Sequence, residues 1–176
     1  MPACLRWRIR GVAGWLFGMP AARNLFRIKR VEYYPCLALL ITLQEPSRVA
    51  ALGYQKQISG PIALIAGNTQ NGISAGSATL TVHSTAEFAR EFFDASEDEI
   101  VGRLLHAAKS WLGSEPLTWQ LHRWKYSQPV ASFPERSLLT LDPAPLAFAG
   151  DAFGGPRIEG SYLSGVSAAE RILALA

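Results

Sequence analysis

The stretch LAFAGDAFGGPRIEGSYLSGVSAAERI, residues 146–172, decides how the end of this chain folds. It predicts a short strand over LAFAG, a Gly-Asp turn, a Gly-Gly-Pro-Arg loop and a helix from about Glu159 to Leu175. A helix start preceded by glycines presents backbone N–H groups to an anion or a carbonyl oxygen. Asp151 lies where the strand ends, and its carboxylate can accept hydrogen bonds from sugar-like hydroxyl groups. The stretch therefore predicts a ligand cradle.

Strands are predicted in the residues that lead up to this stretch. Residues 31–43, VEYYPCLALLITL, predict a strand that begins after Pro35, and the unbroken apolar run indicates burial on both faces. Residues 61–68, PIALIAGN, predict a second strand, and the alternation in ATLTVH at 78–83 predicts a half-exposed third. The segment 44–60 between them predicts a loop with a turn of helix or an edge strand.

Two helices follow, each with a start signal. Ser84 with Glu87, and Ser96 with Glu99, have the spacing of a capping box, and the second helix should stop near Gly113. Residues 117–129 alternate as a strand, whereas residues 129–145 carry four prolines and indicate irregular chain. We therefore expect an α+β fold with a mixed or antiparallel sheet, two central helices and a C-terminal strand-to-helix unit.

The charge is unevenly distributed along the 176 residues. Residues 1–30 hold seven Arg or Lys and no acid, whereas the rest holds ten bases and fourteen acids, which argues against a nucleic-acid surface there. The basic segment is open to three interpretations: a targeting segment, a basic amphipathic arm, or a truncated or mis-started reading frame. Cys4 and Cys36 form no CxxC pair, the three histidines lack metal-ligand spacing, and no apolar run is long enough for a membrane span. We expect a cytoplasmic protein without a bound metal.

At residues 150–171 the sequence resembles a known family. Gly150-Asp151, Gly154-Gly155, Ile158-Glu159-Gly160-Ser161 and Ala168-Ala169-Glu170-Arg171 resemble the C-terminal FAD-binding segment of amine-oxidase-like flavoproteins, most closely the renalase-like NAD/FAD-dependent oxidoreductases. The resemblance extends back through the strand around residues 122–129 to residue 31.

The resemblance implies a cofactor site. Asp151, after Gly150, would bind the ribitol chain of FAD, and the backbone of Ile158, Glu159 and Gly160 would meet the edge of the isoalloxazine ring. It also implies three parts: an atypical basic segment at 1–30, a substrate-domain-like part at 31–145, and the FAD-binding strand and helix at 146–176.

One element of the family's pattern is missing from this sequence. The G-x-G-x-x-G turn that binds the FAD pyrophosphate is absent, because the early glycines in GVAGWLFG have the wrong spacing. The dinucleotide-binding half would then be lost, carried on another polypeptide, or hidden by a frameshift upstream of Val31.

Each candidate residue also has a structural interpretation. Asp151 would serve in a turn or cap, and His122, Trp124 and Tyr126 would be ordinary core instead of lining the flavin face or substrate. Arg157 is expected to be solvated, and Glu159 is explained by the helix dipole without a role as a base.

The resemblance implies a fragment of a FAD-dependent oxidoreductase that transfers a hydride from an amine or reduced nicotinamide, NAD(P)H, to flavin. Its partners would be a small-molecule substrate and a separate dinucleotide-binding chain. Two alternatives stay open: a non-catalytic, flavin-free remnant or partner-binding subunit, and an adaptor that binds nucleic acid or membrane through residues 1–30.

Overall fold

The computed structural model describes residues 31–56, 60–73, 78–141 and 144–175. The three interpretations of the basic segment therefore lie outside the described residues. The described chain divides into two compact units, one formed by residues 35–127 and the other by residues 31–34 together with 128–175. Residues 128–145 thus group with the C-terminal unit, whereas the sequence placed the boundary after residue 145.

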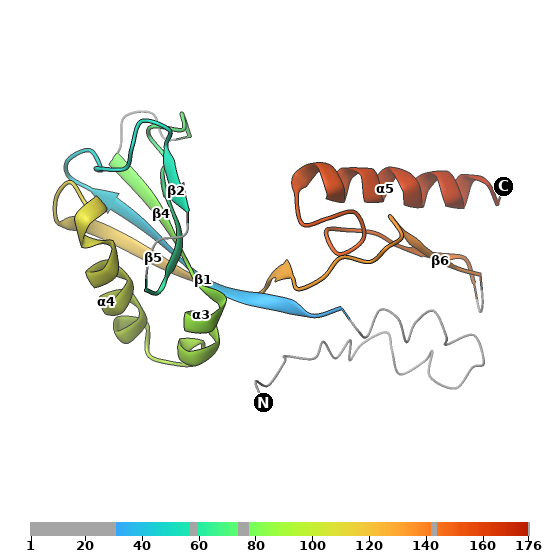
Figure 1. Ribbon diagram of the computed structural model, residues 1–176, viewed down its shortest axis with the longest axis horizontal. Coiled ribbons are helices and arrows are strands. Elements are labelled where there is room, and N and C mark those ends of the chain that lie inside the picture. Colours follow the sequence, from blue (N-terminus) through green and yellow to red (C-terminus); the bar gives the residue numbers. More distant parts are fainter. Residues whose placement is uncertain (1–30, 57–59, 74–77, 142–143, 176) are drawn as a thin grey trace. The chain divides into compact units, whose positions relative to one another are not determined.

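The first unit contains a five-stranded sheet with strand order β2-β3-β4-β1-β5 (Figure 1). The neighbours β2–β3, β3–β4 and β4–β1 pair antiparallel, and Leu39 of β1 lies opposite Val82 of β4. The α+β expectation is confirmed. The strands are β1 (Tyr33–Leu43), β2 (Tyr54–Lys56), β3 (Ile62–Gly67), β4 (Ala78–Ser84) and β5 (Pro116–Pro129).

Two helices cover one face of this sheet, α3 (Ala86–Phe92) and α4 (Glu97–Ala108), and a 3-10 turn over Lys109–Trp111 follows α4 (Figure 1). The core between the helices and the sheet is apolar and contains the following fully buried residues: Leu37, Leu39 and Ile41 of β1, Ile65 of β3, Leu80 and Val82 of β4, and Ile100 and Leu104 of α4. The alternation of each strand accounts for this arrangement, because every second side chain points to the helices.

The helix starts agree only in part with the sequence. Ser96 caps α4 as expected, since its hydroxyl accepts a hydrogen bond from Glu99 N at 3.3 Å. The cap of α3 is Thr85, not Ser84, and its hydroxyl accepts from Phe88 N at 3.2 Å. Ser84 is buried at the end of β4, where its hydroxyl accepts from Leu37 N. The sheet therefore uses the serine that the capping pattern had assigned to the helix.

The burial of β1 also differs from the expectation. Leu37, Leu39, Ile41 and Leu43 are buried on the helix side. On the other side Cys36 and Ala38 are buried as well, but Leu40 is exposed on the face that the helices do not cover, so burial on both faces holds for only part of the strand. Pro35 lies inside the strand, two residues after its start at Tyr33. An apolar run alone does not distinguish a strand covered on both faces from one whose second face carries an apolar surface.

The second unit is built on a two-stranded antiparallel sheet and one long helix. The elements are β6 (Leu138–Thr140), β7 (Leu146–Phe148) and α5 (Ile158–Leu173). The strand β6 lies in the segment that the prolines had indicated as irregular. A small apolar cluster joins Leu138 to Phe153, and the ring of Phe153 stacks on Phe133 at 4.8 Å.

Candidate flavin-contact site

The site is built around the turn between β7 and α5, in the C-terminal unit. Gly150 N donates a hydrogen bond to the hydroxyl of Ser164 at 2.8 Å, and Ser164 is fully buried in α5. This bond ties the turn to the second turn of the helix. Gly150 has φ +140°, a conformation that side chains rarely adopt, so the sharp exit from β7 requires glycine here.

Asp151 is half-buried at this turn and has one partner in the described chain. The phenol of Tyr33 donates a hydrogen bond to Asp151 Oδ1 at 2.9 Å. Among the described residues none donates a hydrogen bond to the second carboxylate oxygen, Oδ2. An ionised carboxylate accepts several hydrogen bonds, so Oδ2 is available to a hydroxyl group of a ligand.

The contact with Asp151 also changes Tyr33. Burial, followed by the hydrogen bond to Asp151 and by its negative charge, raises the pKa of the Tyr33 phenol to about 12. The phenol therefore stays neutral and remains a hydrogen-bond donor well above neutral pH. The sequence analysis did not identify Tyr33, because 118 residues separate it from Asp151 and no local pattern connects them.

The glycines of the loop bring it against the start of α5. A Cβ atom at Gly154 would collide with the carbonyl oxygen of Gly160, and one at Gly160 would collide with the backbone of Gly154 and Gly155. Gly160 is buried by this contact. The close approach of two backbones explains why the sequence carries Gly-Gly before the helix and a glycine in its first turn.

The first turn of α5 lacks a side-chain cap. Arg157 occupies the cap position in an extended conformation, but its side chain makes no capping hydrogen bond, whereas Thr85 and Ser96 cap the other two helices. No hydrogen bond to protein is found for the N–H groups of Ile158, Glu159 and Gly160 within the described residues, and the side chains of Ile158 and Glu159 are exposed. The N–H groups of the exposed residues Ile158 and Glu159 can therefore bind acceptor atoms of a ligand, whereas Gly160 is buried against the loop.

The chemistry of these donors and acceptors fits the flavin part of FAD. The polar edge of the isoalloxazine ring consists of carbonyl oxygens and ring nitrogens, which suit backbone N–H donors. The ribitol hydroxyls suit a carboxylate oxygen such as Asp151 Oδ2. Within the described residues, no atom lies within 4 Å of the position that a Cβ atom would take at Gly150 or Gly155, apart from their chain neighbours. The residues predicted to contact the cofactor, from Gly150 to Gly160, thus lie in one unit.

The aromatic residues predicted to line the substrate lie in the other unit, on β5. Leu121 packs into the core, and Arg123 donates to Phe93 O and Ala95 O on the helix side, so the even-numbered residues point to the uncovered face. His122, Trp124 and Tyr126 are all exposed there, and the rings of His122 and Trp124 lie 4.2 Å apart. They are not core residues of the described chain.

The uncovered face also carries His83. The protein around it desolvates the imidazolium form and lowers the pKa of His83, although part of its ring meets solvent. Its strand neighbours across the sheet are Ala38 and Leu64. Because the neutral form is favoured, His83 contributes a hydrogen-bonding group without a positive charge near neutral pH.

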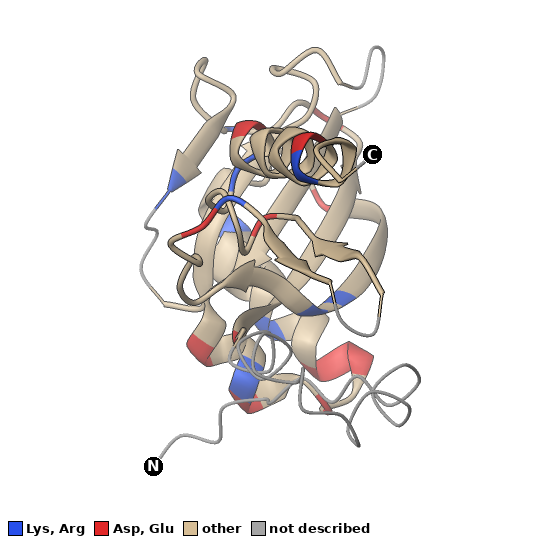
Figure 2. Ribbon diagram, turned by 90° about the vertical axis from the view of Figure 1, so that its right-hand side faces the viewer, with Lys and Arg blue, Asp and Glu red and all other residues tan. Residues whose placement is uncertain are grey.

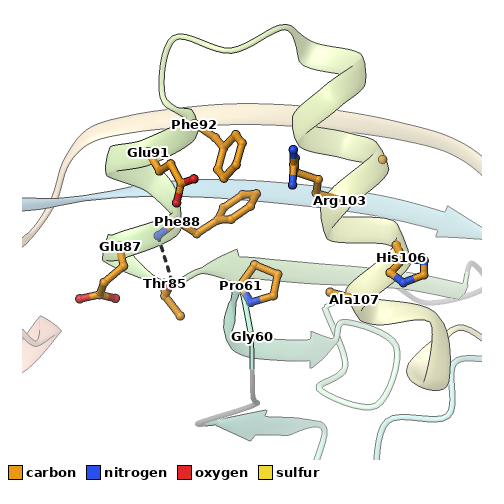
Figure 3. A pocket seen from close by; sticks show the side chains of 11 residues that line it. Gly60, Pro61, Thr85, Glu87, Phe88, Glu91, Phe92, Arg103, His106 and Ala107 are labelled. Carbon is orange, nitrogen blue, oxygen red and sulfur yellow. Dashed lines mark hydrogen bonds between the residues drawn. The ribbon is translucent and has the colours of Figure 1, made fainter.

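A hollow of about 620 Å³ lies on the helix side of the sheet (Figure 3). Its lining includes Phe88 and Phe92 of α3 and Arg103 and His106 of α4 (Figure 3). The Arg103 guanidinium lies over the Phe92 ring and is held by Glu99, a pairing that fixes the two helices together. None of the predicted site residues lines this hollow, so we assign it to helix packing.

The described residues contain no helix that is long and apolar enough to cross a membrane. Nor do the described ranges bring together three or more His, Cys, Asp or Glu side chains in an arrangement that could hold a metal ion.

A comparison with known families gives a match over most of the chain. A family model described as flavin containing amine oxidoreductase matches residues 28–173. The match includes the strand β1, both sheet-covering helices, the turn at Asp151 and all of α5. It spans most of the 176 residues, and the chain belongs to the family of flavin-containing amine oxidoreductases.

Proposed function

We propose that this chain supplies the ribitol- and ring-contacting part of an FAD site in a renalase-like oxidoreductase. The observation that carries the proposal is the arrangement at the end of β7. There the carboxylate of Asp151 is held by Tyr33 and keeps one oxygen available, beside a helix start without a side-chain cap. The family match through both elements supports a flavin as the ligand.

The backbone and the carboxylate have different tasks in this proposal. The N–H groups of Ile158 and Glu159 bind the electronegative edge of the ring, helped by the positive end of the helix dipole, and Gly160 lets the loop pack closely beneath them. Asp151 orients the ribitol chain, and Tyr33 orients Asp151. When bound, the flavin supplies a hydride acceptor for an amine or a reduced nicotinamide such as NAD(P)H.

The uncovered face of the sheet supplies the substrate-lining residues in this proposal. His122, Trp124 and Tyr126 present flat apolar rings with polar tips, which suit a small substrate that contains a ring or an amine. Two of the polar groups on this face, His83 and the hydroxyl of Thr81, are uncharged near neutral pH. Substrate binding there would depend on stacking and neutral hydrogen bonds.

Riboflavin is a suitable probe because it contains the ring and the ribitol chain but no pyrophosphate. We expect saturable quenching of riboflavin fluorescence on titration with the purified chain. Asp151→Asn should weaken binding about tenfold or more, since hydrogen bonds to a charged group contribute about 1.5 to 3 kcal/mol.

The matched control is Asp98→Asn, which makes the same exchange in the first turn of α4 and should leave riboflavin binding unchanged. Two results would contradict the proposal: a wild-type chain that does not bind riboflavin, or an Asp151→Asn variant that binds it as tightly as the wild type. A flavin-free remnant or a purely partner-binding subunit would give the first result.

A further inference from the structure

The hydroxyl of Ser164 connects the two parts of the proposed flavin site. Ser164 lies in α5, six residues after Ile158, and its side chain is fully buried. Its Oγ accepts a hydrogen bond from Gly150 N at 2.8 Å, and Gly150 immediately precedes Asp151. The bond therefore joins the helix that presents the first-turn N–H groups to the turn that presents the carboxylate.

The turn at Gly150 needs an attachment of this kind to hold one conformation. Gly150 has φ +140°, and glycine has more backbone freedom than any other residue. Its carbonyl oxygen accepts a hydrogen bond from Phe153 N at 3.0 Å, which closes the turn on itself but does not attach it to α5. The hydrogen bond to Ser164 makes that attachment.

A second contact attaches the chain to α5 on the other side of Asp151. There the backbone of Gly154 packs against the carbonyl group of Gly160. Such packing limits how closely the loop approaches the helix, whereas a hydrogen bond has a preferred length and direction. The contact at Ser164 is thus the one that fixes the chain directly beside the carboxylate.

This attachment is uncharged. None of residues 160–169 of α5 carries a charge, and in Figure 2 the helix is tan apart from short red and blue sections. A cationic side chain at the position of Ser164 would bind the Asp151 carboxylate and compete with a ligand hydroxyl. A buried serine hydroxyl instead holds the backbone and leaves the carboxylate to accept hydrogen bonds from a ligand.

We propose that Ser164 is a positioning residue that sets the separation between Asp151 and the first turn of α5, an inference that rests on the proposed function. A flavin that carries its ribitol chain bridges these two groups. Its second contact forms within an existing complex, so the strength of that contact depends on the separation. A ligand that meets only the first turn of α5 does not depend on Ser164 in this way.

Two flavins distinguish positioning from general stability. Riboflavin carries the ring and the ribitol chain, whereas lumiflavin carries the same ring with a methyl group in place of the ribitol. The wild-type chain should bind riboflavin more tightly than lumiflavin. Ser164→Ala should weaken riboflavin binding about tenfold and change lumiflavin binding by less than about twofold, both measured by fluorescence quenching. A variant that only destabilised the unit would weaken both ligands equally, since both bind the folded form.

The matched control is Ser167→Ala, the same exchange three residues later in α5. It removes the contact between the Ser167 and Ser137 hydroxyls, which lie 2.9 Å apart, and should leave the binding of both flavins unchanged. Amide hydrogen exchange gives a readout without any flavin. The Gly150 N–H should exchange about tenfold faster in Ser164→Ala but not in Ser167→Ala, with circular dichroism showing both variants folded.

Two further variants test how Ser164 acts. Ser164→Cys keeps a similar volume with a weaker acceptor, and its riboflavin affinity should lie between those of the wild type and Ser164→Ala. In an Asp151→Asn background, where the ribitol contact is already weakened, Ser164→Ala should weaken riboflavin binding by less than about a further twofold. Fully additive losses would mean that Ser164 does not act through Asp151, which contradicts the inference.

Three other results would overturn the inference. Ser164→Ala binds riboflavin as tightly as the wild type, it weakens both flavins equally, or it leaves the exchange of the Gly150 N–H unchanged. If the wild-type chain binds riboflavin and one of these results is found, the proposed function stands and only the role of Ser164 is wrong. A wild-type chain that binds neither flavin would contradict the proposed function, and the inference with it.

Discussion

The helices α4 and α5 differ in the direction of their apolar sides. In α4, Ile100, Val101 and Leu104 are buried against the sheet, and the first turn is acidic and capped by Ser96. In α5 the buried side is small and polar, the apolar side is exposed, and the first turn has no side-chain cap. The two helices bury different kinds of residues. They therefore also expose different outer sides and different first turns.

The difference indicates that α4 contributes to the fold, whereas α5 presents groups that can bind other molecules. Helix α4 completes the apolar core under the sheet, and in its first turn Glu99 N donates a hydrogen bond to the Ser96 hydroxyl. Helix α5 leaves both its N-terminal donors and its apolar side unoccupied by the described residues, which is a cost in stability unless a ligand and a partner supply the contacts. Helix α4 thus serves the fold, whereas the proposed function gives α5 a role in binding.

The largest expected effect on stability comes from removing a buried side chain of α4. Leu104→Ala removes a fully buried side chain and should lower the free energy of unfolding by about 2 to 5 kcal/mol. Leu173→Ala, on the exposed side of α5, should change it by less than about 0.5 kcal/mol in the isolated chain. Chemical denaturation of both variants measures the contrast. A loss at Leu173 as large as that at Leu104 would mean that the apolar side of α5 is already covered.

A smaller effect is expected from giving α5 the cap that α4 has. Arg157→Asp places a carboxylate at the cap position and should stabilise α5 by about 0.5 to 2 kcal/mol. The same carboxylate would bind the N–H groups that we assign to the flavin edge, so riboflavin binding should weaken. Amide hydrogen exchange in the first turn and riboflavin fluorescence report the two changes.

The control for this substitution is Arg157→Gln, which removes the positive charge without supplying a good cap. If both variants bind riboflavin equally, the first-turn N–H groups do not contact the ligand. The expected opposition between helix stability and ligand binding would then be wrong for α5.

The smallest effect is spectroscopic and concerns the site itself. The Tyr33 phenol has a pKa of about 12 against an ordinary value of 10.0, so folding favours its neutral form. Its contribution to stability is fully present below pH 10 and is lost as the pH rises toward 12. Asp151→Asn should lower the pKa of Tyr33, because both the negative charge and a strong acceptor are removed. Ultraviolet titration, with Tyr33→Phe to assign the phenolate signal, measures the shift, and an unchanged pKa would contradict the contact.

Local patterns in the sequence predicted most of the sheet unit. The apolar stripe at Ile100 and Leu104 and the serine before it define α4, because a helix of this kind depends on residues three and four apart. The choice between Ser84 and Thr85 as the cap of α3 was not local. Ser84 binds Leu37 N from β1, 47 residues earlier, and no spacing rule in the sequence contains that contact.

The sequence predicted only those parts of the candidate site that lie close together along the chain. The order of strand, acid, glycines and helix start identified Asp151 and the first turn of α5, and the structure brings these residues together. The role of Tyr33 and the buried hydroxyl of Ser164 depend on tertiary packing, so the sequence indicated neither. The outward side of α5 was also hidden, since the spacing of its apolar residues is the same whether they face inward or outward.

The central claim is that the turn at Asp151 and the first turn of α5 bind the flavin ring and ribitol. Amide chemical shifts of the ¹⁵N-labelled chain during a riboflavin titration test it directly. The account predicts saturable shifts at Asp151, Ile158, Glu159 and Gly160, with no change at the Ser96-capped first turn of α4. Shifts that leave the first turn of α5 unaffected, or that appear equally at both helix starts, would contradict it.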